Sequence, residues 1–292
     1  MLSARSVLAA LVTATTAAAR WRAAGSADPT AVRRKIAVAT WRAPREGRLL
    51  TRLVVDADPV LEYVRTRRAA GAKGLTPMHV LGAAAARALT LVPSANARVL
   101  AGRLLPFDGV AVGFAVDIGD GTDLAPVKVD HAERCTPAEI ATLVWEGVRA
   151  LREGTDAGFR RSARVAAAVP TLLMRPAVAA ASLVVGGLGL PLLGQPGHPL
   201  GSVFISNLAP LGIEEAYLAP VPFARAHVYL ALGAVTERPV VRQGAVVPVR
   251  QFTLCLTGDH RIVDGVQCGR YLAALQELLA GPDVLDTPLA AA

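Results

Sequence analysis

The chain has 292 residues, of which 53% are hydrophobic, and it carries a formal net charge of +8. This apolar content excludes a mainly disordered chain, and the length suits one large domain or two small ones. Arginine supplies almost all of the positive charge. No dense Lys/Arg run with interleaved aromatic residues occurs, so nucleic-acid binding is disfavoured. The three cysteines are scattered and form no CxxC motif or disulfide framework, which favours a reducing, cytoplasmic compartment.

Residues 1–33 have the composition of a leader or a flexible arm. An apolar run from Val7 to Ala19 follows a single arginine, and no acidic residue precedes Asp28. This pattern is typical of a secretory signal or an Arg-rich transit peptide, although an Ala-rich arm or a start codon assigned too early would give the same composition. We expect the folded domain over residues 34–283, followed by a short tail, 284–292.

The folded part begins with one strand and two helices. Residues 49–56 are rich in leucine and valine, which favours a strand. Asp58-Pro59 has the pattern of a helix start and predicts a helix to about Ala70. Thr76-Pro77 repeats this pattern before an Ala-rich helix that we expect to end near Leu91.

Two strands and a third helix follow. The strands are expected at 110–118 and 124–129, around the turn Gly119-Asp120-Gly121. Thr136-Pro137-Ala138-Glu139 is a capping box with proline at the first helical position, and it predicts a helix to about Arg152.

A long apolar segment occupies residues 165–200. Within it, Pro176–Gly194 carries no charge, and its length is close to the ~20 residues that span a bilayer. Several glycines and a proline interrupt it, and Arg175 lies at its edge, so a spanning helix is disfavoured. We expect a subunit or partner interface first, attachment to a membrane surface second, and a spanning segment third.

Three further strands and a final helix complete the pattern. The strands are expected at 201–208, 228–235 and 246–256, with a turn near Arg242-Gln243-Gly244. A last helix, from Val266 to Leu279, ends at the stop signal Gly281-Pro282. No internal repeat is visible, and the chain from Arg33 onward reads as one mixed α/β unit.

The most informative motif is Asp259-His260-Arg261-Ile262-Val263-Asp264-Gly265, between an apolar strand and the last helix. A histidine held between a strand and a helix start can be fixed while its ring faces a cleft, which suits a general base. The isolated pair of His260 and Asp264 would be weak evidence, because most such pairs are ordinary packing.

The complete string resembles the DHRxxDG motif of the acyltransferase component of 2-oxo-acid dehydrogenase complexes, the dihydrolipoamide acyltransferases. It is more distantly similar to the HHxxxDG motif of chloramphenicol acetyltransferase and peptide-synthetase condensation domains. Other segments resemble the family in its own order: Pro93-Ser94-Ala95-Asn96-Ala97 after a helix, Val112 to Asp117 with Leu124 to Val127 as a strand pair, and Phe204-Ile205-Ser206-Asn207-Leu208. The resemblance covers about 33–283.

This resemblance implies an α/β fold in the form of an α+β two-layer sandwich with a mixed sheet, like chloramphenicol acetyltransferase. It implies trimers or larger assemblies with active sites between neighbouring subunits, so that His260 of one subunit would face Ser206 of the next. His260 would be the general base for a thiol, Ser206 would stabilise the oxyanion, and Asp264 would fix local geometry. The expected substrates are acyl-coenzyme A and a lipoyl thiol supplied in trans, because no lipoyl domain is recognisable.

Simpler structural roles remain for several of these residues. Ser206 alone could be a strand-end hydroxyl bonded to the backbone, Cys255 has the surroundings of a core residue, and Asp259 and Arg261 are expected to form an ion pair that holds the turn. The other four histidines show no metal-ligand spacing, so we expect no metal site.

Two other functions compete with acyl transfer to a thiol. One is a non-catalytic trimeric scaffold or membrane-associated assembly protein that retains the fold. The other is an acetyltransferase that acts on a small hydroxyl compound. Gly258, where the family often has an aromatic residue, and Ala209, where it has glycine, put the substrate fit in doubt more than the fold.

Overall fold

The computed structural model describes residues 47–119, 121 and 123–289. The expectations for the leader or arm at 1–33 therefore lie outside the described residues. So do the start of the domain at residue 34 and the last three residues of the tail.

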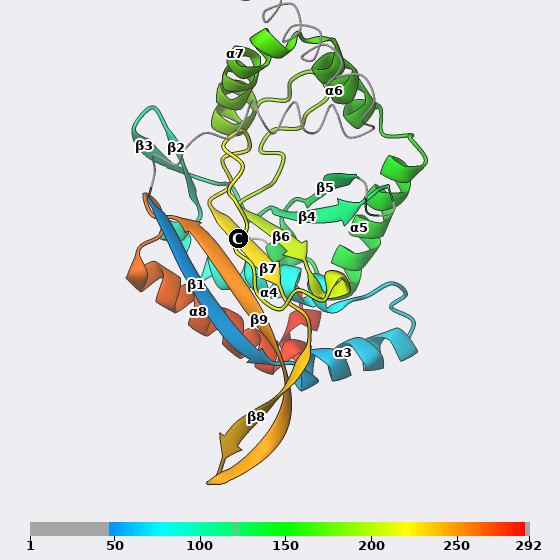
Figure 1. Ribbon diagram of the computed structural model, residues 1–292, viewed down its shortest axis with the longest axis vertical. Coiled ribbons are helices and arrows are strands. Elements are labelled where there is room, and N and C mark those ends of the chain that lie inside the picture. The colour runs from blue at the N-terminus through cyan, green and yellow to red at the C-terminus, as the bar shows by residue number, and fades with distance from the viewer. Residues whose placement is uncertain (1–46, 120, 122, 290–292) are drawn as a thin grey trace, which may run out of the picture.

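A mixed seven-stranded sheet forms the centre of the molecule (Figure 1), with the strand order β1-β9-β7-β6-β4-β5 and β8 paired to β9. The pairs β4–β6 and β6–β7 are parallel and the others are antiparallel. The strands are β1 (Arg48–Asp56), β4 (Val112–Asp117), β5 (Leu124–Val129), β6 (Val203–Asn207), β7 (Val228–Leu232), β8 (Thr236–Arg242) and β9 (Ala245–Asp259).

Helices cover one face of this sheet, which confirms the expected two-layer α+β architecture (Figure 1). They are α3 (Asp58–Ala69), α4 (Pro77–Thr90), α5 (Pro137–Arg152) and α8 (Gly265–Ala280). Short helical turns lie at η1 (Pro93–Ala95), η2 (Ala132–Arg134), η4 (Ala209–Leu211) and η5 (Pro282–Asp286).

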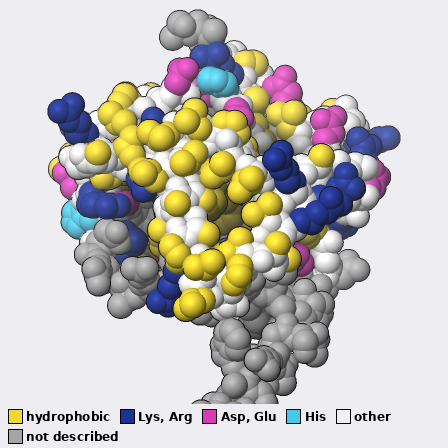
Figure 2. All heavy atoms as spheres, turned by 90° about the horizontal axis from the view of Figure 1, so that it is seen from above, with side chains coloured by type: hydrophobic (Ala, Val, Ile, Leu, Met, Phe, Trp, Pro, Cys, Tyr) yellow, Lys and Arg dark blue, Asp and Glu magenta, His cyan; other side chains and the backbone are white. Residues whose placement is uncertain are grey.

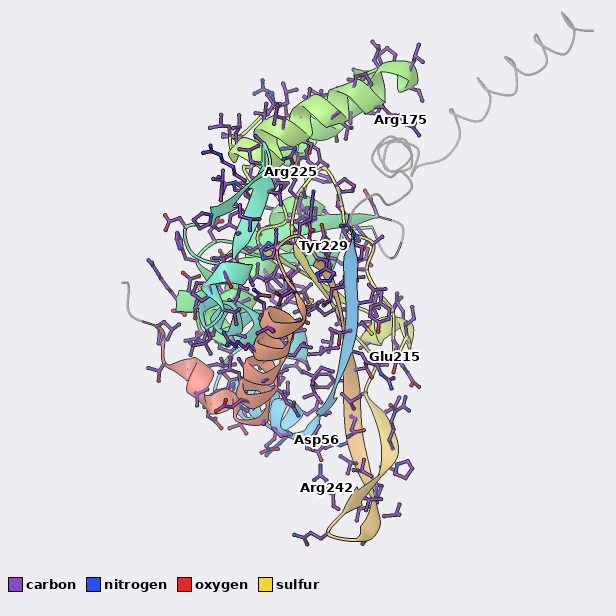
Figure 3. The ribbon with its side chains drawn as sticks, turned by 90° about the vertical axis from the view of Figure 1, so that its left-hand side faces the viewer. Asp56, Arg175, Glu215, Arg225, Tyr229 and Arg242 are labelled. Carbon is purple, nitrogen blue, oxygen red and sulfur yellow. The ribbon has the colours of Figure 1, made fainter. Side chains whose placement is uncertain are left out.

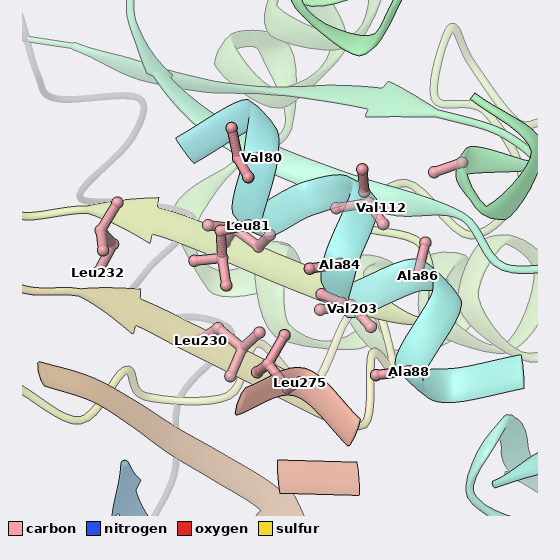
Figure 4. Packing of buried hydrophobic residues seen from close by; sticks show 14 of the residues in the cluster. Val80, Leu81, Ala84, Ala86, Ala88, Val112, Val203, Leu230, Leu232 and Leu275 are labelled. Atoms are coloured by element: carbon pink, nitrogen blue, oxygen red, sulfur yellow. The ribbon is translucent and has the colours of Figure 1, made fainter. Parts of the chain in front are cut away.

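The core lies between α4 and the central strands (Figure 4). Every residue of α4 from His79 to Leu89 is buried. Its alanines allow the helix backbone to approach the sheet closely, where Val203 and Leu230 are fully buried. Because side chains alternate along a strand, these residues face the helices and their neighbours face the opposite side.

The helix starts follow the local signals in the sequence. Thr136 accepts a hydrogen bond from Glu139 N, and the Glu139 carboxylate accepts from Thr136 N, so the expected capping box is present. Thr76 is the N-cap of α4, as predicted. The start of α3 differs by one residue: Ala57 is the N-cap and Asp58 the first helical residue, since the N–H of Ala57 already pairs with the Arg250 carbonyl.

Three strands were not predicted. β2 (Ala97–Leu100) and β3 (Arg103–Pro106) form a hairpin around Ala101-Gly102, an uncommon turn pair in which both residues have positive φ. The third is β8, which contains a proline and three charged residues and so lacks the composition of a strand. The turn at Gln243-Gly244, by contrast, lies where the sequence indicated it.

The apolar insertion folds into helices at the top of the molecule (Figure 1). These are α6 (Ala157–Ala168), α7 (Thr171–Ala181) and a π-helical continuation, η3 (Ser182–Leu188). Gly186 and Gly187, expected to break the segment, lie inside the helix, because their missing side chains allow it to pack closely on residues 223–225. By length and composition, Thr171–Leu188 is the one helix among the described residues that could cross a membrane.

Two buried histidines predict that the fold is sensitive to acid. Burial, the largest cause, lowers the pKa of His79 and of His227 from 6.5 to about 4. Both groups bind protons less tightly in the folded chain than in the unfolded chain. The free energy of unfolding is therefore highest above pH ~6.5 and decreases as the pH falls toward ~4, by roughly 3 kcal/mol for each histidine. Thermal denaturation should show the Tm falling across this window.

The His227→Leu variant tests this prediction. Neither ring nitrogen of His227 has a well-formed hydrogen bond to a described residue, so leucine should cost little at neutral pH and should reduce the loss of Tm in acid. An unchanged pH dependence in this variant would show that other groups control the acid transition.

Candidate active site

The turn after β9 fixes the backbone of His260 at one end of the sheet. Its N–H donates to the carbonyl of Gly47 at 3.2 Å. The N–H groups of Ile262 and Val263 donate to the carbonyl of Asp259, each at 2.9 Å, and both side chains are buried in the core. The imidazole itself is exposed, so a rigid turn presents a solvent-accessible ring.

One ring nitrogen of His260 is held, and the other, Nε2, forms no hydrogen bond with any residue that the structure describes. Nδ1 lies 3.2 Å from the carbonyl oxygen of Val263. A carbonyl only accepts hydrogen bonds, so in the neutral ring this contact favours the proton on Nδ1 and a lone pair on Nε2. A fixed imidazole with an open Nε2 has the arrangement required of a general base.

An ion pair within the motif reinforces the turn. Arg261 Nε and Nη2 lie 2.9 and 2.6 Å from the two carboxylate oxygens of Asp259. Burial raises the pKa of Asp259, but the hydrogen bonds from Arg261 and the charges of Arg261 and Arg48 outweigh it, so the pKa lies below its ordinary value. The expected pairing of Asp259 with Arg261 is confirmed.

Asp264 is engaged by the helix that follows. It is the N-cap of α8, and its Oδ1 accepts from Val266 N at 2.8 Å and Gln267 N at 3.1 Å. Gln267 Oε1 accepts in return from Asp264 N at 3.1 Å, which completes a capping box. These contacts match the expected role in local geometry rather than a catalytic triad.

Replacing Asp264 should separate this capping role from chemistry. Alanine removes the acceptor and should cost about 1 kcal/mol of stability, seen as a Tm lower by roughly 2–4 °C. Asparagine keeps an oxygen that can cap the helix, so the Asp264→Asn variant should have the Tm of the parent. Its acyl-transfer rate should stay within about tenfold of the parent rate. If the Asn variant loses its rate while its melting is unchanged, the carboxylate charge itself acts in the reaction.

Ser206 lies near the end of β6, on the sheet face opposite to α4 and α8. It pairs across the sheet with Ala231 of β7, which in turn pairs with Cys255 of β9. Its neighbour Ile205 is fully buried against the helices, so the Ser206 side chain faces the other way. Ser206 is half-buried, and its hydroxyl forms no hydrogen bond with any residue that the structure describes.

Ser206 and His260 do not meet within one chain. His260 is five positions along β9 from Cys255, and Ser206 is two strands away, so the strand spacings place the two residues roughly 19 Å apart. A site that uses both therefore requires a second copy of the chain, which is the arrangement that the sequence resemblance implies.

The other candidate residues have structural surroundings. Cys255 is 1% exposed and burial raises the pKa of its thiol, which confirms it as a core residue. Phe107 stacks on His227 and contacts His198 edge-on. Within the described ranges, no group of three His, Cys, Asp or Glu residues could hold a metal ion.

Two residues of this site were not found from the sequence. Gly47 contacts the backbone of His260, and Arg48 pairs with Asp259 across β1 and β9. Both lie more than 200 positions earlier in the chain, and only the strand register brings them to the turn. No local signal in the sequence could have indicated this.

A comparison with protein families identifies the segment that holds both candidate residues. Residues 200–286, which include Ser206, His260 and Asp264, match the family described as 2-oxoacid dehydrogenases acyltransferase (catalytic domain). The matched segment is less than a third of the 292-residue chain.

Two curated relatives illustrate the extent of this similarity. The chain is 30% identical over 84 residues to the lipoamide acyltransferase component of the branched-chain alpha-keto acid dehydrogenase complex of Bacillus subtilis. It is 38% identical over 82 residues to the probable mitochondrial dihydrolipoyllysine-residue succinyltransferase of Schizosaccharomyces pombe. Each match covers 28% of this chain but only 19% and 18% of those proteins, so the chain matches about a fifth of their length.

The fold is shared over much more of the chain. The probable dihydrolipoamide acetyltransferase of Listeria monocytogenes superposes with a TM-score of 0.62 at 17% identity, over 86% of this chain and 90% of that one. The dihydrolipoamide acetyltransferase of Azotobacter vinelandii gives a TM-score of 0.60 at 19% identity, over 87% of each chain. These matches confirm the fold expected from the sequence.

Proposed function

We propose that the protein is an acyltransferase that moves an acyl group between coenzyme A and a thiol of the dihydrolipoyl type. The observation that carries the proposal is the geometry of His260: Nδ1 is held by the Val263 carbonyl, and Nε2 forms no hydrogen bond with any described residue. This histidine lies in the segment that matches an acyltransferase catalytic domain.

Each residue then has one task in the reaction. Nε2 of His260 takes the proton from the acceptor thiol, and the thiolate attacks the thioester carbonyl of the acyl-coenzyme A. The new C–S bond gives a tetrahedral oxyanion, to which the hydroxyl of Ser206 from a neighbouring copy donates a hydrogen bond. Collapse breaks the C–S bond to coenzyme A, whose thiolate receives the proton from Nε2.

The Azotobacter vinelandii enzyme supports these assignments. Its crystallographic and enzymatic study concerned the role of a serine, a histidine and an asparagine in the catalytic mechanism, with the asparagine four positions after the histidine. Asp264 follows His260 by the same spacing. The serine of that enzyme precedes its histidine by 52 positions, and Ser206 precedes His260 by 54.

Partners and location are part of the proposal. A structure similar to this chain, with a TM-score of 0.61 at 21% identity, forms the cubic core of a pyruvate dehydrogenase complex. We infer that this protein also forms trimers, because Ser206 and His260 can meet only between copies. A lipoyl-bearing protein would supply the thiol in trans, and the free cysteines Cys135, Cys255 and Cys268 favour a cytoplasmic location.

The test uses the full chain and a panel of acyl-coenzyme A donors. Acetyl, propionyl, succinyl and branched-chain donors are each incubated with dihydrolipoamide, and the acyl-dihydrolipoamide product is measured by mass spectrometry. A donor-specific product that depends on the protein supports the proposal. Acyl transfer to a hydroxyl compound with no transfer to the thiol contradicts the proposal and favours the hydroxyl acetyltransferase. The absence of turnover with every donor, by a protein that is folded and trimeric, contradicts it and favours the non-catalytic scaffold.

A further inference from the structure

The helix Thr171–Leu188 is anchored to the body at its C-terminal end. There, Arg225 Nε donates to Ser182 Oγ at 3.3 Å, and Arg98 Nε donates to the carbonyl of Gly187 at 3.0 Å. Val185 is fully buried, and a Cβ at Gly186 would collide with a backbone carbonyl of the body. The N-terminal part of the helix projects away from this anchor (Figure 3).

The projecting part exposes a continuous apolar face. Leu172 is 86% exposed and Leu183 is 49% exposed. With Pro176 and Ala179 they follow the spacing i, i+4, i+7, i+11, which places all four on one side of the helix. The opposite side holds Met174, which is 3% exposed. Seen from above, this face of the molecule is broadly hydrophobic around a central hollow (Figure 2).

The same region is purely basic in its charges. Residues 157–200 contain four arginines and no aspartate or glutamate. Arg160, Arg161 and Arg164 lie on the exposed side of α6, within about 100° of one another on the helix, and none of them forms an ion pair with a described residue. A basic polar face beside an apolar helix is the pattern of segments that lie in the surface of a membrane.

Two other arrangements fit this surface less well. Pairing two copies through α6 and the helix Thr171–Leu188 would bring like charges together, because residues 157–200 contain no aspartate or glutamate. A spanning helix would have to pull Val185, Gly186 and Gly187 out of the body, and 18 residues reach only about 27 Å along a helix, against the ~30 Å hydrocarbon core.

We propose that α6 and the helix Thr171–Leu188 dock on an anionic membrane surface, with the apolar face at the acyl-chain boundary and the arginines on lipid phosphates. This binding is independent of the proposed acyl transfer. It would hold the His260 turn near the bilayer, because Arg225, which anchors the helix, lies two residues before His227, whose carbonyl accepts a hydrogen bond from the N–H of Asp259 at 3.0 Å.

The experiment is flotation of the full-length protein with lipid vesicles. Vesicles of phosphatidylcholine alone are compared with vesicles that contain phosphatidylglycerol, at low and high salt. Three variants are compared with the parent. The first is the double variant Leu172→Asp/Leu183→Asp, and the second is the triple variant Arg160→Gln/Arg161→Gln/Arg164→Gln. The third is a matched control, Leu91→Asp, at an exposed leucine on another element. Circular dichroism verifies that each variant is folded.

We expect the parent to float with anionic vesicles and to dissociate at high salt. The triple arginine variant should bind roughly a hundredfold more weakly, about fivefold for each arginine. The double leucine variant should also lose binding, while Leu91→Asp should bind like the parent. Three results would overturn the proposal. The first is that the parent does not float, and the second is that it binds neutral and anionic vesicles equally well. The third is that the parent forms oligomers without vesicles and that the double leucine variant does not form them.

Discussion

The His260→Ala variant should lose acyl transfer almost completely while remaining folded. Removal of a general base at Nε2 should lower the rate from acyl-coenzyme A to dihydrolipoamide by roughly 10²–10⁴-fold. The side chain is exposed and the turn is held by backbone contacts and the Asp259–Arg261 pair, so the Tm should change little. The rates are measured at saturating and at low acceptor, so that a loss of turnover is distinguished from a loss of binding.

A second histidine gives the matched control. His131 is also exposed and lies at a left-handed backbone position, which asparagine tolerates. His131→Asn should therefore retain the parent rate, because His131 follows β5, which lies four strands away from β9 across the sheet. Equal, measurable rates for the parent and His260→Ala would contradict the proposed role of His260, because Nε2 would then take no proton in the slow step.

The features that were predictable from the sequence are those with local causes. The capping box of Thr136 and Glu139, the N-cap at Thr76 and the turn at Gln243-Gly244 each depend on a few consecutive residues. The His260 turn belongs to the same class, because its ion pair and its cap connect residues at most three positions apart. The motif from Asp259 to Gly265 could therefore be recognised from the sequence alone.

The features that were missed depend on distant partners. β8 becomes a strand only because β9 extends beyond the sheet and offers a complete edge for pairing (Figure 1). Gly47 reaches His260 only through the register of β1 with β9. The glycines at 186 and 187 look like helix breakers in the sequence, yet they allow the helix to contact the body. Such contacts are set by topology, which a single sequence does not display.

Two inactive variants should restore activity when they form mixed trimers. Ser206→Ala removes the proposed oxyanion donor and should lower the rate by about 10²–10³-fold on its own. If each site takes its histidine from one copy and its serine from the next, a mixed trimer of Ser206→Ala and His260→Ala chains contains sites with both residues intact. Random mixing in equal amounts should make about a quarter of the sites complete.

The roughly 19 Å separation of Ser206 and His260 within one chain makes this test decisive for the geometry. The two variants are coexpressed with different tags, purified through both tags, and assayed beside each variant alone. Homotrimers are removed by this purification, and each mixed trimer contains one complete site of three, so recovery to about a third of the parent rate is expected. Such recovery requires a site shared between copies, because no single chain in the mixture carries both residues. A mixture no faster than its components, with mixed trimers present, would mean that the two residues do not act in one site and that another donor stabilises the oxyanion near His260.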